Sequence, residues 1–398
     1  MFGPVINASN IISAFCYSLV RVEPYTACSH KCIYCYVRWR IPNSQKVDSS
    51  PEAVKVFGII ARKLRLSGIR PIPARLSTLS DPFQPQEAKS KLSLKVLNIA
   101  LSEGYPIIVN TKGTLISEEP WLTLLKDLAS EKLVIIQASL SSMNDETARI
   151  IEPYAPSPSA RLKTLEKLSA KDIPVVVRLS PYIPGLTLKP SPERVVEALA
   201  EAGVKHVTVE SLRIETAEAQ GFFSLLGLNR PPMEAYSLRL EDDVPPLLKP
   251  DLKARLPEYL TLRALLEDHG ISFATCKEGL FSLHTAEDCC GIYMLEGYAI
   301  RPTLYDLYLK ARRQHLSVKQ IMEVFSNLPQ KYVFGERLKA YPRILRKPLK
   351  SHEKKLIKIL ASPEILQRLT PELSVEENGR LKAKPILQDK RFDAKDLT

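Results

Sequence analysis

The sequence lacks the features that would place a chain in a membrane, a secretory pathway or a repeat array. Its 398 residues contain no uninterrupted apolar run of about 18 residues, so we expect no membrane-spanning helix and no membrane partner. The N-terminus has no basic segment followed by an apolar run, which a signal peptide would need. No fixed-period repeat and no low-complexity tract is evident. We therefore expect a cytoplasmic protein.

Cysteine is scarce as well, with seven residues in the whole chain. Thiols stay reduced in the cytoplasm, so we interpret these cysteines as ligands, catalytic groups or core residues and not as disulfides. Disulfides are not needed, because a chain of this length can bury a large core without them. The composition, 45% hydrophobic and 25% charged, is typical of globular proteins.

Positive charge is in excess, and it is unevenly distributed. The formal net charge is +12. Residues 301–398 hold 22 Lys and Arg against 11 Asp and Glu, which leaves only about +1 for residues 1–300. This asymmetry favours either a polyanionic partner such as a nucleic acid, bound through residues 301–398, or a solvated Lys-rich helical surface. No known nucleic-acid-binding motif is visible in this segment.

Short apolar runs alternate with helical patterns over residues 17–210. Each run has the length of a strand and is rich in Val, Ile or Leu, as strands buried on both faces are. The expected strands are residues 17–22, 74–79, 106–110, 133–139, 175–179 and 206–210, and the expected helices are residues 51–66, 89–102, 118–130, 159–170 and 191–202. Six strand–helix repeats in this order predict a parallel sheet with right-handed crossovers. The predicted fold is therefore α/β, a partial barrel of six β/α repeats, with a doubly wound open sheet as the alternative.

The pattern changes after this unit. Residues 211–260 are expected to form loops and short helices. A helix at 260–269 and a further strand at 271–275 are expected to follow. The last hundred residues have mainly helical patterns, and the polar tail from residue 373 is expected to be frayed. The expected helices there are residues 317–327, 353–360 and 364–369. We expect three parts: the barrel in residues 1–215, an extension in residues 216–300, and a basic, mainly helical region in residues 301–398.

Three of the seven cysteines lie on one loop directly after the first expected strand. Cys28, Cys32 and Cys35 have the spacing C-x3-C-x2-C. Three closely spaced thiolates can hold three corners of a cubane iron–sulfur cluster and leave the fourth iron open to a substrate. With His30, the same loop could form a structural zinc site, since such sites normally need four ligands. The position after a strand, at the start of a β/α unit, favours the cluster.

With this loop the chain resembles the radical S-adenosylmethionine (SAM) superfamily, and within it the branch related to spore photoproduct lyase. The resemblance covers about residues 15–215. Besides the cysteine loop, it rests on residues 24–28, 80–87, 111–112, 139–140, 152–158 and 180–185, which occur in the expected order. It implies a [4Fe–4S] cluster and SAM as cofactors, reductive cleavage of SAM to a 5′-deoxyadenosyl radical, and hydrogen abstraction from a substrate. It also implies a one-electron donor such as flavodoxin or ferredoxin, and a lyase- or transferase-like reaction.

The resemblance assigns roles to residues around the loop. Tyr34 is implied to lie beside the adenine, and Tyr36 near the cofactor. Ser80 and Asp81 end the second expected strand, where parallel α/β folds build their sites. By resemblance, the carboxylate would bind ribose hydroxyls or the methionine ammonium of SAM. The alternative for this Ser-Asp-Pro sequence is a turn or a helix cap.

Polar residues also occur in the later strands. Lys112 ends the third strand, and by resemblance its ammonium suits the methionine carboxylate. Ser139 ends the fourth and is implied to bind the ribose. Arg178 lies inside the fifth, where an unpaired charge is costly to bury, so we expect it to point into the barrel and to pair with a carboxylate or the cofactor. Glu210, which ends the sixth strand, is a further polar residue of the interior.

One residue departs from the pattern of the branch. Spore photoproduct lyase has a cysteine that donates a hydrogen atom two residues before the Ser-Asp pair, and here that position is Thr78. A threonine hydroxyl is a much poorer hydrogen-atom donor than a thiol. We therefore expect a divergent member of the branch with another substrate.

A second cysteine group follows the barrel. Cys276, Cys289 and Cys290 have the spacing C-x12-C-C, with His284 among them. Adjacent cysteines seldom both reach one metal without strain, so this is not a standard zinc or ferredoxin pattern. Three interpretations remain: an auxiliary iron–sulfur cluster or second metal, a thiol hydrogen donor near the radical, or reduced core cysteines. Cys16, in the first strand region, is expected in the core.

The sequence therefore supports two hypotheses of function, one for an enzyme and one for a binding protein. The first is a radical SAM enzyme that acts on an unidentified substrate, with a nucleic acid among the options. The second is a zinc-stabilised nucleic-acid-binding protein without radical chemistry. The sequence does not name the substrate, because a shared fold and cofactor site serve different reactions.

Overall fold

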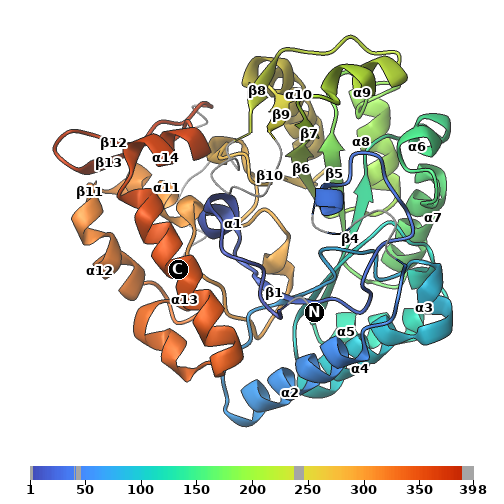
Figure 1. The fold of residues 1–398 in the computed structure, drawn as a ribbon, viewed down its shortest axis with the longest axis horizontal. Coiled ribbons are helices and arrows are strands. Elements are labelled where there is room, and N and C mark those ends of the chain that lie inside the picture. The colour runs from blue at the N-terminus through green and yellow to red at the C-terminus, as the bar shows by residue number, and fades with distance from the viewer. Residues whose placement is uncertain (1–2, 40, 42–45, 237–245, 388–398) are drawn as a thin grey trace.

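The computed structural model describes residues 3–39, 41, 46–236 and 246–387. Its centre is a sheet of seven parallel strands in the order β1-β2-β3-β4-β5-β6-β10 (Figure 1). The strands are β1 (Val20–Val22), β2 (Ala74–Leu76), β3 (Ile107–Thr111), β4 (Val134–Leu140), β5 (Val175–Tyr182), β6 (His206–Ser211) and β10 (Ser272–Thr275). The first six follow one another in chain order, so the predicted α/β class is confirmed. The strand expected at residues 271–275 becomes the seventh.

The sheet is not a closed barrel. Its two edge strands are β1 and β10, and within the described part of the chain they do not pair with each other. The N-terminal segment covers the edge of β1 instead: Val5 forms an antiparallel bridge to Val20, and the N–H of Ile6 donates to the carbonyl of Leu19 at 2.9 Å. An edge that is covered in this way cannot recruit a strand from another molecule.

Helices cover the outer face of the sheet, and the five predicted ones are present. The helices of this layer are α2 (Pro51–Leu66), α3 (Pro85–Ser90), α4 (Leu92–Glu103), α5 (Trp121–Ser130), α6 (Asp145–Ile151), α7 (Pro158–Ser169), α8 (Pro192–Glu201) and α10 (Leu252–Asp268). The helix expected at residues 89–102 is interrupted, because Lys91 adopts a left-handed conformation with φ 51°. The buried carboxylate of Glu87 then accepts from the N–H groups of Ser93 and Leu94 at the start of α4. A side-chain acceptor thus satisfies the free amides of the new helix.

The segment after β6 contains strands that the sequence did not predict. Instead of loops and short helices alone, it forms a small antiparallel sheet in the order β7-β9-β8, beside one short helix. These elements are β7 (Ile214–Glu215), α9 (Ala219–Leu225), β8 (Met233–Ala235) and β9 (Leu247–Pro250). The strands are too short to show an alternating pattern in the sequence. The next helix, α10, begins earlier than expected, because the side chain of Asp251 accepts from the N–H of Ala254 and caps it.

The C-terminal region is mainly helical, as predicted, but its tail is not frayed throughout. Leu373 and Leu381 are buried, and their strands pair in a three-stranded antiparallel sheet, so the expectation of fraying from residue 373 was wrong. Apolar anchors at both strands hold a segment that is otherwise polar. The elements are α11 (Leu304–Arg313), β11 (Leu316–Ser317), α12 (Ile321–Ser326), α13 (Arg343–Leu360), α14 (Pro363–Leu369), β12 (Leu373–Val375) and β13 (Arg380–Ala383). Residues 388–398 lie outside the described part of the chain.

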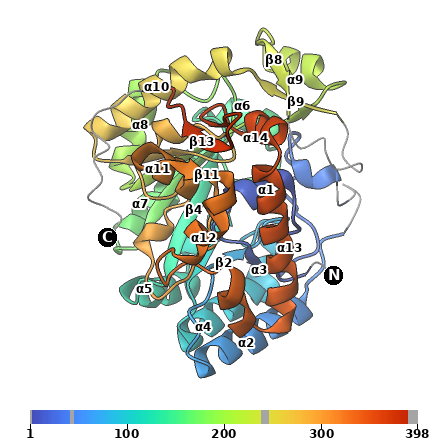
Figure 2. The ribbon, with the colours of Figure 1, turned by 90° about the vertical axis from the view of Figure 1, so that its left-hand side faces the viewer.

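The C-terminal region packs on the N-terminal segment. Figures 1 and 2 show α13 beside α1 (Asn10–Phe15). The ring of His352, on α13, contacts the hydroxyl of Ser13 at 2.9 Å and the carbonyl of Ile6 at 2.7 Å. Buried side chains of both segments also share one hydrophobic cluster. The division into three parts remains a prediction, but residues 301–387 share a core with the start of the chain.

No helix of the described residues is long and apolar enough to cross a membrane.

We predict that acid weakens this packing through His352. Burial lowers the pKa of His352 to about 3, whereas an unfolded histidine titrates near 6.5. The unfolded chain therefore binds more protons below pH 6.5, and stability falls as the pH drops from about 6.5 towards 3. At pH 5.5 this group alone should lower the free energy of unfolding by about 1.4 kcal/mol relative to pH 8.

Urea unfolding at the two pH values measures this effect. His352→Gln keeps a hydrogen-bonding side chain without the titration, so its stability should depend less on pH. His269→Gln, at an exposed position, is the control and should behave as wild type. Equal pH dependence in wild type and His352→Gln would contradict the prediction.

Candidate functional site

A cavity of about 360 Å³ opens at the carboxyl ends of the parallel strands. Its walls come from the N-terminal segment with α1, the cysteine loop (residues 28–35), the strand ends and residues 276–290. Every residue that the sequence predicted for the site lines this cavity: Cys28, Cys32, Tyr34, Cys35, Tyr36, Ser80, Asp81, Lys112, Ser139, Arg178, Cys276, Cys289 and Cys290. Parallel strands bring residues that are distant in sequence to one edge, which is why they meet here.

The three thiols of the cysteine loop are free and face the cavity. Burial raises the pKa of Cys28 and of Cys32 to about 12. The thiols are therefore protonated when no metal is present, and a metal must displace these protons on binding. Three accessible thiols on one loop fit the three protein ligands of a [4Fe–4S] cluster.

The geometry around His30 does not fit the alternative zinc site. Its Nε2 lies 3.3 Å from Oδ2 of Asp81, an ion-pair contact without hydrogen-bond alignment, and its Nδ1 lies 3.2 Å from the carbonyl of Tyr154. Both ring nitrogens thus face partners other than the thiols. In the part of the chain that the structure describes, no three Cys, His, Asp or Glu side chains converge on a single metal ion. Cubane ligands bind different irons and need no such convergence.

Gln84 fixes the cysteine loop from the side of the sheet, a role that the sequence did not reveal. Its side chain is fully buried. It accepts from the N–H of Ser29 at 2.8 Å and donates to the carbonyl of Ala27 at 3.0 Å, so it holds the backbone on both sides of Cys28. Gln84 belongs to the segment 80–87 that carried the family resemblance, but a glutamine alone gave no signal of this function.

Asp81 connects three parts of the site. One carboxylate oxygen accepts from the hydroxyl of Thr111 at 2.6 Å and the N–H of Phe83 at 2.9 Å, and the other accepts from the N–H of Lys112 at 2.6 Å. Burial raises the pKa of Asp81, but the His30 contact and these hydrogen bonds outweigh it and bring the pKa to about 2. The carboxylate therefore joins the end of β3 to the cysteine loop. A direct contact of Asp81 with SAM remains a prediction.

A second charged network lies beside Tyr34. Lys112 Nζ is 3.9 Å from Glu152 and 5.8 Å from the centre of the Tyr34 ring. Glu152, only 1% exposed at its side chain, also accepts from the Tyr34 hydroxyl and pairs with Arg161. Burial raises the pKa of Glu152, but Lys112 and Arg161 outweigh it and lower the pKa to about 2. The sequence gave no role to Glu152 or Arg161; only packing shows that they hold Tyr34 and Lys112 in place.

Polar contacts also fix the loop after β2. The Tyr36 hydroxyl donates to the carbonyl of Thr78 at 2.6 Å. The Thr78 hydroxyl donates to the buried carboxylate of Glu23 at 2.6 Å, so it is held against β1. Ser80 contacts the hydroxyl of Ser77 at 2.9 Å. Ser139 lines the cavity with its side chain, while its carbonyl accepts from Arg161 at 2.9 Å.

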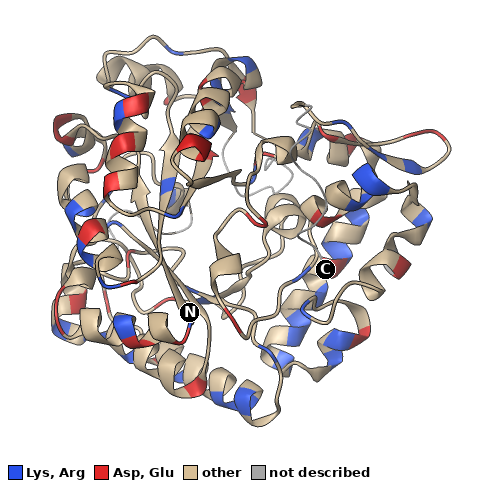
Figure 3. Ribbon diagram, turned by 180° about the vertical axis from the view of Figure 1, so that it is seen from behind, with Lys and Arg blue, Asp and Glu red and all other residues tan. Residues whose placement is uncertain are grey.

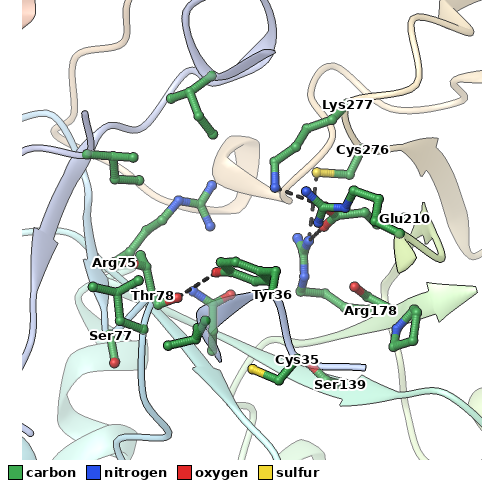
Figure 4. Close-up of a pocket in the computed structure, with 18 of the residues that line it drawn as sticks. Cys35, Tyr36, Arg75, Ser77, Thr78, Ser139, Arg178, Glu210, Cys276 and Lys277 are labelled. Carbon is green, nitrogen blue, oxygen red and sulfur yellow. Dashed lines mark hydrogen bonds and ion pairs between the residues drawn. The ribbon is translucent and has the colours of Figure 1, made fainter. Parts of the chain in front are cut away.

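Glu210 forms ion pairs with three cations in another part of the cavity wall. It accepts from Arg178 at 2.7 Å and from Lys277 at 2.9 Å, and it pairs with Arg213. Figure 4 shows Arg178, Glu210, Lys277 and Cys276 grouped together, across Tyr36 from Ser77 and Thr78. Arg178 does point into the interior and pair with a carboxylate, and Glu210 is that partner.

The second cysteine group is brought together at the inner end of the cavity. The sulfurs of Cys289 and Cys290 lie 3.7 Å apart. Arg75 Nη2 lies 3.1 Å from the sulfur of Cys290, and Arg178 Nη2 lies 3.7 Å from that of Cys276. The three thiols are buried and flanked by guanidinium groups. His284 is not among their partners, because its Nε2 contacts the hydroxyl of Thr275 at 3.0 Å. A second cluster or metal remains a prediction.

We predict that Gln84→Met loosens the cysteine loop. Methionine has a similar size but cannot replace either hydrogen bond, so the N–H of Ser29 and the carbonyl of Ala27 lose their buried partner. The loss should be on the order of 2 kcal/mol in the free energy of unfolding. Gln86→Met, two positions away and half-buried, is the matched control. Denaturant unfolding of the metal-free protein measures both, and equal stability of the two variants would refute this role of Gln84.

Comparisons with known proteins agree with this geometry. The model of the radical SAM superfamily matches residues 22–191. An uncharacterised protein of Mycobacterium tuberculosis is 27% identical over 263 residues, which cover 62% of this chain and 75% of that protein. An uncharacterised protein of the Acidianus two-tailed virus is 32% identical over 155 residues, which cover 38% of this chain and 50% of that protein.

The solved structures that resemble this chain include spore photoproduct lyase. Its complex with a dinucleoside spore photoproduct has a TM-score of 0.50 at 12% identity, over 65% of this chain and 77% of the lyase. A mutant of the lyase gives 0.51 at 13% identity, with the same coverage. At this identity the likeness concerns the fold. The family match spans the cysteine loop and the strands β2 to β5, and residues 22–191 therefore belong to the radical SAM superfamily.

Proposed function

We propose that this protein is an enzyme that uses a [4Fe–4S] cluster and SAM to abstract hydrogen from a substrate in the cavity. The observation that carries the proposal is the set of three free thiols, Cys28, Cys32 and Cys35, which open onto a cavity walled by polar strand ends. Membership of the superfamily implies both cofactors. When bound, they supply the one-electron cleavage of SAM to a 5′-deoxyadenosyl radical.

The protein's own part is to hold the ligands in position. Cys28, Cys32 and Cys35 would bind three irons. Gln84 and Asp81 hold the loop against β2 and β3. Residues fixed in this way on a rigid sheet keep a reactive group in one place, which radical chemistry requires.

The network around Glu152 would position SAM. Burial lowers the pKa of Lys112, but Glu152 and other negative neighbours raise it overall, so the amine is a cation at neutral pH. A cation at the end of β3 suits the methionine carboxylate. Tyr34, held by Glu152, would pack on the adenine, while Ser139 would reach the ribose. Tyr36 and Ser80 complete this proposed cofactor wall.

The surroundings also support water exclusion and electron supply. The N-terminal segment and α1 form part of the cavity wall, and a site that is closed off from solvent protects reactive species. Radical SAM enzymes need an electron donor, and we propose a flavodoxin or a ferredoxin for this one.

Thr78 supports a substrate other than the spore photoproduct. Its hydroxyl is bound to Glu23, and it offers no S–H bond at the position that holds the thiol donor in the lyase branch. The contacts of His30 with Asp81 and Tyr154, and not with the thiols, favour this function over the competing one, a zinc-stabilised nucleic-acid-binding protein without radical chemistry.

We predict that Cys32→Ala abolishes both cluster binding and SAM cleavage. Anaerobic reconstitution of the wild type should give about four irons per chain, and addition of dithionite and SAM should give 5′-deoxyadenosine. Cys16→Ala is the control, since Cys16 lines the same cavity outside the loop and should leave the iron content unchanged. If fully reconstituted wild type produced no 5′-deoxyadenosine, the proposed function would be wrong.

An exposed row of cations supports a second proposal, that a nucleic acid binds to the C-terminal region. Five basic residues occur at intervals of three or four along α13, on the face opposite its buried leucines, and all five are exposed. They are Arg343, Lys347, Lys350, Lys354 and Lys358. Figure 3 shows Lys and Arg along the helices of the C-terminal region, near the label C. The related lyase structure contains a dinucleoside photoproduct, which fits a nucleic acid as substrate class.

We predict that Lys347, Lys350 and Lys354 contribute to binding of duplex DNA. Changing all three to Gln should weaken binding and reduce the slope of log K against log salt by up to about 2.7. The matched control changes Lys163, Lys167 and Lys171, which are exposed on and after α7, to Gln. Fluorescence anisotropy at several salt concentrations measures both. Equal loss in the two variants would mean that the charge acts non-specifically.

A further inference from the structure

The inner end of the cavity carries more positive charge than its carboxylates balance. Among the described residues that line it, the cations at this end are Arg75, Arg178, Arg213 and Lys277, which we call the inner basic group. Glu210 is the carboxylate at this end: it pairs with Arg178, Arg213 and Lys277, while Arg75 contacts the sulfur of Cys290. Four cations against one carboxylate leave three positive charges in excess.

These cations are mostly buried, so water screens the excess charge only in part. Arg75 is 8% exposed, and the side chains of Arg178, Arg213 and Lys277 are 11%, 12% and 17% exposed. Charges that are removed from water in this way destabilise a fold unless an opposite charge or a hydrogen-bond acceptor meets them. A partner of negative charge is therefore expected at this place.

The thiols of Cys276 and Cys290 can supply part of this negative charge if they are ionised. Arg178 Nη2 lies 3.7 Å from the sulfur of Cys276. Arg75 lies 3.1 Å from the sulfur of Cys290. If both thiols were ionised, one positive charge would still remain. The thiols alone do not complete the charge balance.

The donors of the group also point to an oxyanion. Within the described residues, the acceptors of Arg75 are the carbonyl of Ser18 at 3.4 Å and the sulfur of Cys290. Those of Arg178 are Glu210 and the sulfur of Cys276, both reached through Nη2. Each guanidinium carries five N–H groups, so donors are left on the cavity side. Planar guanidinium donors match the geometry of carboxylate and phosphate oxygens.

The inner basic group is not required for binding the carboxylate of SAM. Lys112 is the cation proposed for it, and Lys112 belongs to the separate network of Glu152 beside the cysteine loop. The inner basic group is thus left for the second molecule of the reaction.

We propose that the inner basic group binds an oxyanion of the substrate, a carboxylate or a phosphate, and so places the rest of the substrate towards the cysteine loop. This inference rests on the proposed function, because the oxyanion site becomes a substrate site only if a radical is generated beside it. It narrows the substrate to an anionic molecule, or to an anionic part of a larger one.

The test measures binding of inorganic phosphate and of acetate to the reconstituted full-length protein by calorimetry at constant ionic strength. Lys277→Gln should weaken binding of the preferred anion about tenfold, whereas Lys277→Arg, which keeps the charge, should stay within about twofold of wild type. Lys277 is chosen because Glu210 keeps two arginine partners in either variant. Arg75→Lys provides a second, charge-conserving probe that should change the preference between the two anions.

Three outcomes would overturn the inference. Neither anion binds to the wild type, or Lys277→Gln binds as well as wild type, or saturating SAM displaces the anion, which would assign the site to the cofactor. The triple Gln variant of Lys163, Lys167 and Lys171 controls for surface charge and should bind as wild type.

The same preparation distinguishes failure of the proposed function from failure of the oxyanion site. Iron content and 5′-deoxyadenosine formation are measured on the wild type without any substrate. A protein that makes 5′-deoxyadenosine but binds neither anion refutes only the oxyanion site. A protein that binds the anion in a Lys277-dependent way but makes no 5′-deoxyadenosine supports the oxyanion site and refutes the radical chemistry.

Discussion

The position of the cysteine loop depends on a small set of buried hydrogen bonds that connect it to the carboxyl ends of the sheet strands. Asp81 and Gln84 lie just after β2, and they reach the end of β3 and the backbone around Cys28. Because both side chains are buried, water does not compete for these hydrogen bonds, and removal of either partner leaves polar groups unpaired. A loop without secondary structure can thus present three thiols in a fixed arrangement, with the sheet as its support.

The cavity has two charged networks with different surroundings. Beside the cysteine loop, Lys112 and Arg161 share the buried Glu152, and Asp81 is a second carboxylate near Lys112, so positive and negative charges balance. At the inner end, Glu210 faces more cations than it can neutralise. A zwitterionic cofactor suits the first environment and an anionic substrate the second. Under the two proposals, this division of charge would give the cofactor and the substrate separate places along one cavity.

The open edge of the barrel explains why the two ends of the chain pack together. Because β1 and β10 do not pair with each other, the interior of the partial barrel would be exposed to solvent if no other segment covered it. The N-terminal segment with α1 lines the cavity, and α13 holds that segment through His352. The basic C-terminal region is therefore part of the structure that closes the site, while its charged face points outward.

The sequence by itself determined the α/β class, the six repeats and the place of the three-cysteine loop, because buried parallel strands leave apolar runs and metal ligands leave fixed spacings. It did not predict the short strands β7, β8 and β9 or the pairing of β12 with β13, which have too few residues for a periodic pattern. Nor did it indicate Gln84, Glu152 or the partners of Arg75, since a single polar residue has no spacing to read. Those assignments came from the tertiary structure, because the charge and hydrogen bonds of a buried side chain depend on neighbours that only folding brings within reach.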